Sequence, residues 1–142
     1  MKKIMTVSLV LVLLCGSLAT SAFSGQRENP ATFEGFWEIF KAAVTKRDVE
    51  TIARVSKFPI EMSYGIPSIR TKAQLTKRYK QLFNEQSDAA ACFAKAKPEK
   101  DAANPKRYSI ACPDAAGNEV VIYHFEQTRT GWKLTGLDNL NE

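Results

Sequence analysis

The chain has 142 residues, of which 44% are hydrophobic and 25% are charged, and its formal net charge is +5. These values are typical of a soluble globular protein with one domain, and they exclude an intrinsically disordered chain. With 7 glycines, 6 prolines and no internal repeat, the sequence also excludes collagen-like, low-complexity and solenoid proteins.

The N-terminus has the three regions of a secretory signal peptide. A basic start is followed by an apolar run at 4–15 and by small residues at 16–22. We expect cleavage after Ala22 or Ser24, which leaves a single domain, residues 23–142, in the periplasm or outside the cell and not integrated in a membrane. The alternatives are an uncleaved membrane anchor and, because the apolar run ends in a cysteine, a lipoprotein.

Cleavage changes what the charges and the cysteines indicate. Loss of the two N-terminal lysines lowers the formal net charge to +3, which is too weak to indicate a polyanion partner, and we expect no nucleic acid partner outside the cytoplasm. Cys92 and Cys112 remain, and in an oxidising compartment they predict one disulfide, with a reactive thiol or metal ligand as the alternative. Because the chain has one histidine and no CxxC pair, we expect no metal site and no cofactor.

Three helices are predicted from apolar spacing and capping residues. The first covers 32–46, where one face carries Phe33, Phe36, Trp37, Phe40 and Val44. A second, short helix follows Asp48, an N-cap residue, and ends before Lys57. The third covers 72–84, because Thr71 and Gln74 have the spacing of a capping box ahead of an apolar face.

Alternation of apolar and polar residues predicts four strands. The first covers 58–64, and Pro59, which has no amide donor, places it at a sheet edge. The others cover 107–112, 119–128 and 131–140, and the two short links between them predict an antiparallel meander. Between the third helix and this meander the periodicity is poor. There we expect an Ala-rich piece around Cys92 and then a mobile polar loop from Lys95 to Lys106.

The order of these elements is accompanied by three loose motifs: an aromatic first helix, a Phe-Pro-Ile strand start at 58–60, and a Gly-Trp-Lys-Leu run at 131–134. In these features the stretch from Thr32 to Leu140 resembles the NTF2-like superfamily, the cystatin-type α+β cone. The resemblance implies N-terminal helices packed on a curved antiparallel sheet, with a pocket between the first helix and the concave face. It implies no single activity, because the superfamily includes isomerases, dehydratases, transport factors and plain binding domains.

Few residues offer acid–base chemistry. Enzymes of the superfamily that the chain resembles carry an acid or base, often Asp or His, and a Tyr hydroxyl in the cone. The candidates here are His124, which needs an orienting partner, and two carboxylates, Glu61 and Asp138, either of which burial would make a better proton acceptor. The simpler interpretation makes all three solvated surface residues. The motifs GxGxxG, GxxxxGK(S/T), GxSxG and HExxH are absent.

Large aromatic side chains are the candidates for ligand binding. We expect five of them to line the pocket of the cone and to hold a small apolar ligand there: Trp37, Phe40, Tyr64, Tyr79 and Trp132. The same side chains suit a hydrophobic core equally well.

The leading hypothesis is therefore a secreted or periplasmic, non-enzymatic binding or accessory domain with an apolar cone-shaped pocket. One alternative is a small lyase or isomerase that uses a pocket carboxylate and His124. Another is an envelope protein that binds a partner protein, as inhibitors and immunity factors do. Because both faces of 119–128 carry apolar residues, we also expect a homodimer through the outer face of the sheet. Five cations between Arg70 and Lys80 indicate a solvated helix face, or else a surface for anionic envelope partners.

Overall fold

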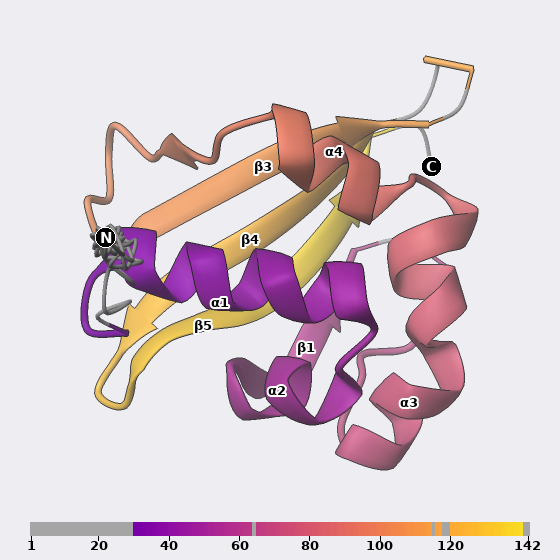
Figure 1. The fold of residues 1–142 in the computed structure, drawn as a ribbon, viewed down its shortest axis with the longest axis horizontal. Helices are drawn as coiled ribbons and strands as arrows, with labels where there is room; N and C mark the ends of the chain where they lie inside the picture. The colour runs from indigo at the N-terminus through magenta and orange to yellow at the C-terminus, as the bar shows by residue number, and fades with distance from the viewer. Residues whose placement is uncertain (1–29, 64, 115, 118–119, 141–142) are drawn as a thin grey trace, which may run out of the picture.

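The computed structural model describes residues 30–63, 65–114, 116–117 and 120–140. The predicted signal peptide, its cleavage site and Tyr64 lie outside the described residues. Within them, five strands form one sheet and the helices pack against it (Figure 1). None of the helices in these ranges is long and apolar enough to cross a membrane.

Helices α1 (Phe33–Lys46) and α2 (Val49–Arg54) form where the apolar spacing predicts them. Thr32 and Asp48 cap them with side-chain oxygens that accept hydrogen bonds from amides of the first turn. Between the two helices Arg47 has a φ of 55°. This left-handed conformation ends α1 and turns the chain directly into α2.

Helix α3 (Lys72–Lys80) continues into a π-helical turn, η1 (Gln81–Glu85), so the predicted third helix changes its winding near its end. Thr71 caps α3 by accepting a hydrogen bond from the Gln74 amide at 3.2 Å. The Gln74 side chain accepts a hydrogen bond from the Arg70 amide at 2.7 Å. The predicted capping box is thus closed one residue earlier in the chain than the standard form.

The segment with poor periodicity contains α4 (Ala89–Lys95) and a two-residue strand, β2 (Glu99–Lys100). The polar loop expected after Lys95 therefore holds a strand and a defined turn. In this turn the Asp101 carboxylate accepts hydrogen bonds from two backbone amides, at 2.8 and 3.1 Å. A carboxylate that binds backbone amides two and three residues ahead stabilises a turn without any apolar pattern, which is why the periodicity missed it.

The remaining strands lie close to their predicted positions: β1 (Ser56–Met62), β3 (Arg107–Pro113), β4 (Val120–Thr128) and β5 (Gly131–Asn139). The sheet order is β1-β5-β4-β3-β2. Strands β3 to β5 pair antiparallel, as the meander predicts, and β2, which was not predicted, adds to β3 in the same antiparallel way. The edge strand β1 runs parallel to β5, which the long chain segment between them permits. Pro59 lies in this edge strand, where its missing amide is tolerated.

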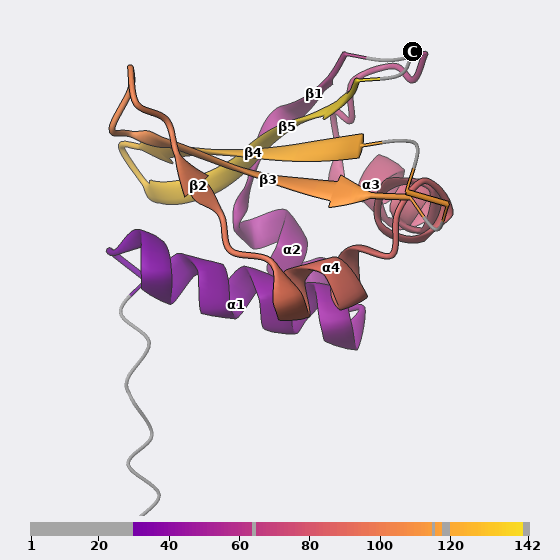
Figure 2. The same ribbon diagram turned by 90° about the horizontal axis from the view of Figure 1, so that it is seen from above.

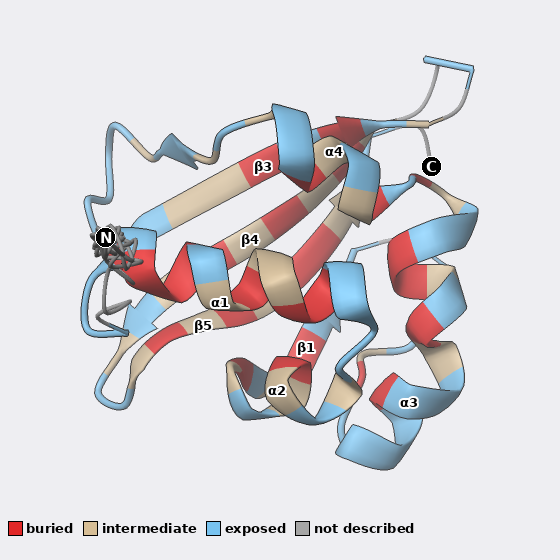
Figure 3. Cartoon of the chain, in the orientation of Figure 1, coloured by how far each residue is buried: buried red, intermediate tan, exposed pale blue. Residues whose placement is uncertain are grey.

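Helices α1, α2 and α4 lie on one side of the sheet and leave the other side open (Figure 2). Along β4 the buried residues Val121, Tyr123 and Phe125 alternate with the half-buried residues His124 and Glu126 (Figure 3). Because side chains alternate between the two faces of a strand, the first three face the helices and the other two lie on the open face. The predicted fold class, α+β with N-terminal helices packed on a curved antiparallel sheet, is confirmed, except that the edge strand β1 pairs parallel with β5.

Aromatic side chains fill the space between α1 and the sheet. Phe40 is fully buried at the centre of this cluster. Its ring centroid lies 5.2 to 6.3 Å from those of Phe36, Trp37, Phe83, Phe93 and Phe125. At this point of the cone the protein's own side chains occupy the space that a ligand would need.

Candidate functional site

The predicted ligand-binding aromatics that the structure describes belong to the core. Each exposes 8% or less of its surface: Trp37, Phe40, Tyr79 and Trp132. The Tyr79 hydroxyl donates a hydrogen bond to the Val44 carbonyl oxygen at 2.7 Å. Burial raises the pKa of the Tyr79 hydroxyl, in opposition to the nearby Arg47 cation. Trp37 differs from the other three because one side of it also borders a surface groove.

This groove, the α1–α4 groove, lies between α1 and the segment from α4 to β2, and its volume is about 380 Å³. Its aromatic lining consists of Phe33, Trp37, Phe93 and Tyr108. The ring of Tyr108 stacks on that of Phe33 with centroids 3.7 Å apart. Charged residues also line the groove: Glu34, Glu38, Lys41, Lys95 and Lys97. This volume and the aromatic walls suit a small organic ligand.

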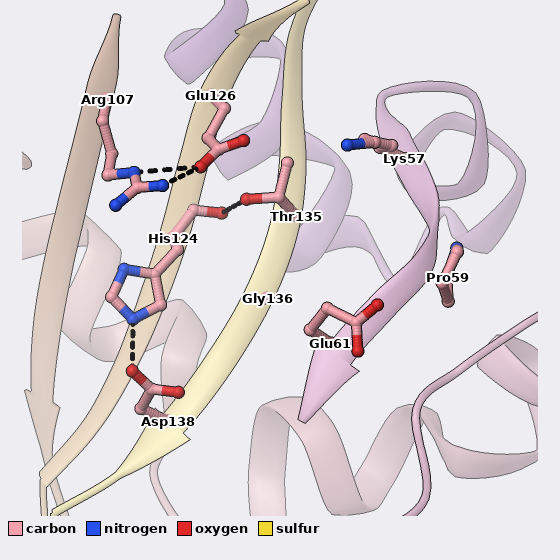
Figure 4. A pocket seen from close by; sticks show the side chains of 9 residues that line it. All are labelled: Lys57, Pro59, Glu61, Arg107, His124, Glu126, Thr135, Gly136 and Asp138. Atoms are coloured by element: carbon pink, nitrogen blue, oxygen red, sulfur yellow. Dashed lines mark hydrogen bonds and ion pairs between the residues drawn. The ribbon is translucent and has the colours of Figure 1, made fainter. Parts of the chain in front are cut away.

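The open face of the sheet carries a second groove, the outer groove, with a volume of about 360 Å³ (Figure 4). The three residues predicted for acid–base chemistry, His124, Asp138 and Glu61, all line it. In each strand they alternate with the buried side chains that face the helices, so they lie on the open face of the sheet and outside the interior of the cone (Figure 4). The full lining is Lys57, Pro59, Glu61, Arg107, His124, Glu126, Thr135, Gly136 and Asp138.

Irregular strand pairing opens the outer groove. The β1–β5 ladder is interrupted between Ser56 and Glu61, and in the β4–β5 ladder Thr135 is an extra residue between two consecutive pairs. Such a β-bulge bends a strand and redirects its side chains. Below the bulge the strands approach again at Gly136, where an added Cβ would lie 3.2 Å from the Glu61 carbonyl oxygen. Glycine therefore permits the two strands to close beneath the groove.

His124 and Asp138 form a contact across β4 and β5. The His124 Nε2 and Asp138 Oδ2 atoms are 2.7 Å apart, and the two side chains expose 28% and 35% of their surface. An ionised carboxylate only accepts hydrogen bonds, so Nε2 is the donor in this pair. In the neutral imidazole Nδ1 is then an acceptor, which is the arrangement of a base held by a carboxylate.

Asp138 is the orienting member of this pair. Partial burial acts to raise the pKa of Asp138, but hydrogen bonds from Ser63 and His124 and the positive charge of His124 outweigh it and lower that pKa below 3.8. The carboxylate is therefore ionised at neutral pH. The lowered pKa suits Asp138 to holding His124 in place, and a carboxylate that acts as the base in this groove stays a prediction.

The other charged residues of the outer groove are arranged around this pair. Arg107 donates two hydrogen bonds to the Glu126 carboxylate, from Nε at 2.9 Å and from Nη2 at 2.5 Å. The Glu61 carboxylate accepts a hydrogen bond from the Ser68 hydroxyl at 2.8 Å. Lys57 forms no ion pair with any described residue. Its ammonium group is therefore available to a ligand.

Cys92 and Cys112 form the predicted disulfide, which joins α4 to β3. No three His, Cys, Asp or Glu side chains of the described ranges are grouped so that they could hold a metal ion.

Sequence reasoning missed several lining residues. Phe33 and Phe93 look like ordinary core residues, and Tyr108 is the second residue of a strand, so nothing in their local spacing indicates a common groove. The pairing of Arg107 with Glu126 joins adjacent strands, and it could have been proposed from the register of the meander.

No family model and no curated protein sequence matches the chain. Among solved structures, a provisionally assigned aromatic ring hydroxylase from Novosphingobium aromaticivorans is 12% identical, with a TM-score of 0.46 over 79% of this chain and 87% of that chain. An NTF2-like protein with a cystatin-like fold from the same species is 12% identical, with a TM-score of 0.41 over 70% of this chain and 74% of that chain. The hexachlorocyclohexane dehydrochlorinase LinA-type3 from Novosphingobium barchaimii is 12% identical, with a TM-score of 0.44 over 72% of this chain and 79% of that chain. All three TM-scores are below 0.5, so these likenesses carry no argument about this chain, and its function has to be argued from the two grooves.

Proposed function

We propose that this chain is a secreted or periplasmic, non-enzymatic binding domain that holds a small ligand with an apolar body in the α1–α4 groove. The observation that carries the proposal is the aromatic lining of this groove, at a volume of about 380 Å³. Pockets for small organic molecules have volumes of this order and are lined by apolar side chains with a few polar groups.

The packing around the groove supports the same choice. Phe40, Tyr79 and Trp132 are enclosed in the core, whereas Trp37 and Tyr108 reach the groove from α1 and β3. Lys95 is the last residue of α4 and Lys97 lies two residues further along the chain, and neither forms an ion pair with a described residue. An apolar ligand that also carries a negative group fits this combination of walls and cations.

The proposal is tested by filling the groove. Ala96 lines it, and Ala96→Phe places a ring in the space that the ligand would occupy. Ala91 is exposed on α4, which ends directly before Ala96, and it does not line the groove, so Ala91→Phe is the matched control. The probe is anilinonaphthalene sulfonate, which combines apolar rings with an anion. We expect its fluorescence on binding to be lost in Ala96→Phe and retained in Ala91→Phe, and equal binding to both variants would contradict the proposal.

A second function, proton transfer by a small lyase or isomerase, is favoured by the 2.7 Å contact between His124 and Asp138. In this mechanism Nδ1 of His124 takes a proton from a carbon acid while the ionised Asp138 stabilises the imidazolium. Lys57 lines the same groove and its ammonium would stabilise the negative charge that develops on the substrate.

The second function is tested by following solvent deuterium exchange next to the carbonyl group in 2-oxo and 3-oxo acids by NMR. We expect the unchanged protein to catalyse this exchange. The His124→Ala variant should lose it, and the Asp138→Asn variant should show a slower rate. The absence of exchange, or the same rate in both variants and in the unchanged protein, would remove this function.

The homodimer expected from the open face of β4 stays a prediction. Val120 and Ile122 are half-buried on this face, so a second copy would cover apolar surface there. Light scattering during gel filtration gives the answer directly, since a monomer mass at all concentrations would contradict it.

A further inference from the structure

The open face of the sheet has a third hollow, the turn-end hollow, next to the turn between β4 and β5. Its volume is about 560 Å³. Three cations from different segments line it: Lys57 of β1, Arg129 of the turn and Lys133 of β5. The rest of the lining consists of Ser56, Glu126, Gln127, Thr128 and Thr130.

The negative charge in this lining is already engaged. Glu126 is the sole carboxylate among the lining residues, and Arg107 binds it with two hydrogen bonds. The turn-end hollow therefore has an excess of positive charge. Neither Lys57 nor Arg129 has an acidic partner within ion-pair distance among the described residues.

Two features hold the hollow in shape. The Lys133 ammonium donates a hydrogen bond to the Arg54 carbonyl oxygen at 2.7 Å, which fixes this cation beside α2. The Thr128 hydroxyl donates to the Gly131 carbonyl oxygen at 2.8 Å and accepts from the Thr130 amide at 3.2 Å, which orders the turn that carries Arg129. Like charges that face one hollow repel each other, and an anion bound between them removes this cost.

We propose that the turn-end hollow binds a phosphate or sulfate ester. A tetrahedral anion presents several oxygens in different directions, which matches cations that approach from β1, from the turn and from β5. The guanidinium of Arg129 is suited to bind two of these oxygens at once, and the ammonium groups of Lys57 and Lys133 bind as point charges. A volume of about 560 Å³ also accommodates the organic part of the ester.

This site is separate from the α1–α4 groove, because it lies on the opposite face of the sheet and shares no lining residue with that groove. The anion site is therefore independent of the ligand site proposed in the α1–α4 groove, although it shares Lys57 and Glu126 with the outer groove. Such esters occur as small molecules free in solution and as the headgroups of anionic lipids, and the experiment has to distinguish these two sources.

The test compares two double variants with the same change in net charge. Lys57→Gln with Arg129→Gln removes two cations of the hollow. The matched control, Lys77→Gln with Lys80→Gln, removes two cations that are exposed on α3. Circular dichroism and thermal unfolding establish that both variants fold like the unchanged protein before binding is measured.

The probes are glycerol 3-phosphate, measured by calorimetry, and phosphatidylcholine vesicles with and without phosphatidic acid, measured by sedimentation. We expect the unchanged protein to bind at least one of these phosphates, and binding to fall about tenfold or more in the Lys57 and Arg129 variant, since charge-assisted hydrogen bonds are lost. The control should stay within about twofold, because screened charges far from the site contribute little.

Binding of glycerol 3-phosphate in solution assigns a free ester, and binding only to phosphatidic acid vesicles assigns a lipid headgroup. The proposal is overturned if neither probe binds, or if the control variant loses as much affinity as the variant of the hollow.

Discussion

Replacement of Phe40 by alanine distinguishes a core residue from a pocket residue more sharply than any other single change in this chain. Phe40 was a candidate for ligand binding on the sequence, and its ring is fully buried against five other aromatic rings. If it is core, the Phe40→Ala variant loses stability and keeps its ligand. If it lines an open pocket, the variant loses the ligand and keeps its stability.

The magnitude follows from the packing. A fully buried phenylalanine removes about 150–250 Å² from water, which at about 25 cal/mol per Å² corresponds to about 4–6 kcal/mol as an upper value. Alanine retains a small part of this area, and the surrounding rings relax only partly into the cavity. We therefore expect a loss of about 3–5 kcal/mol in the free energy of unfolding, a large part of the 5–15 kcal/mol that is usual for a domain.

The assay is urea unfolding at equilibrium, followed by tryptophan emission and by circular dichroism. Phe40→Leu is the control, because leucine refills much of the space and should cost less than alanine. Anilinonaphthalene sulfonate binding is measured on the folded Phe40→Ala variant and should be retained, since Phe40 does not line the α1–α4 groove. A loss below about 1 kcal/mol, the range of ordinary surface substitutions and mild core changes, would refute the argument that the cone is filled at this point.

Three further predictions concern stability. Reduction of the Cys92–Cys112 disulfide, whose cysteines are 20 residues apart, should lower the free energy of unfolding by about 3 kcal/mol, measured by urea unfolding with and without reductant. Tyr79→Phe should cost about 1–2 kcal/mol, because the Val44 carbonyl oxygen loses its buried donor; an unchanged urea midpoint would contradict this. Folding lowers the pKa of Asp138, so the ionised carboxylate stabilises the folded protein above pH 3.8, and this stabilisation is lost as the pH falls through the folded pKa. The unfolding curves of Asp138→Asn and of the unchanged protein should therefore differ at neutral pH and converge in acid.

Much of the fold could be predicted because it rests on local patterns. The aromatic stripe of α1 appears at helical spacing in the sequence, and the structure buries Phe36 and Phe40 on that stripe. Thr32 and Asp48 identify two helix starts, since their side chains bind backbone amides only a few residues ahead. The three-strand meander was predictable for a similar reason, because short links allow only neighbouring antiparallel pairing.

The candidate sites were less accessible to such reasoning. His124 and Asp138 could be named as acid–base candidates from residue type alone. Their contact could not be predicted, because it depends on the register of β4 against β5 and on the bulge at Thr135. The interruption of the β1–β5 ladder opens the outer groove, but it does not change the alternation of apolar and polar residues in β1 and so could not be predicted from it.

The sequence by itself determined which side of α1 and of β1 faces the core, because the periods of helices and strands depend only on neighbouring residues. It also determined the cysteine pair, since two cysteines in the predicted mature chain have one way to pair. Only the tertiary structure decided that most predicted pocket aromatics close the cone and that charged side chains gather on the open face. These are contacts between distant segments, and the packing of the whole sheet sets their distances.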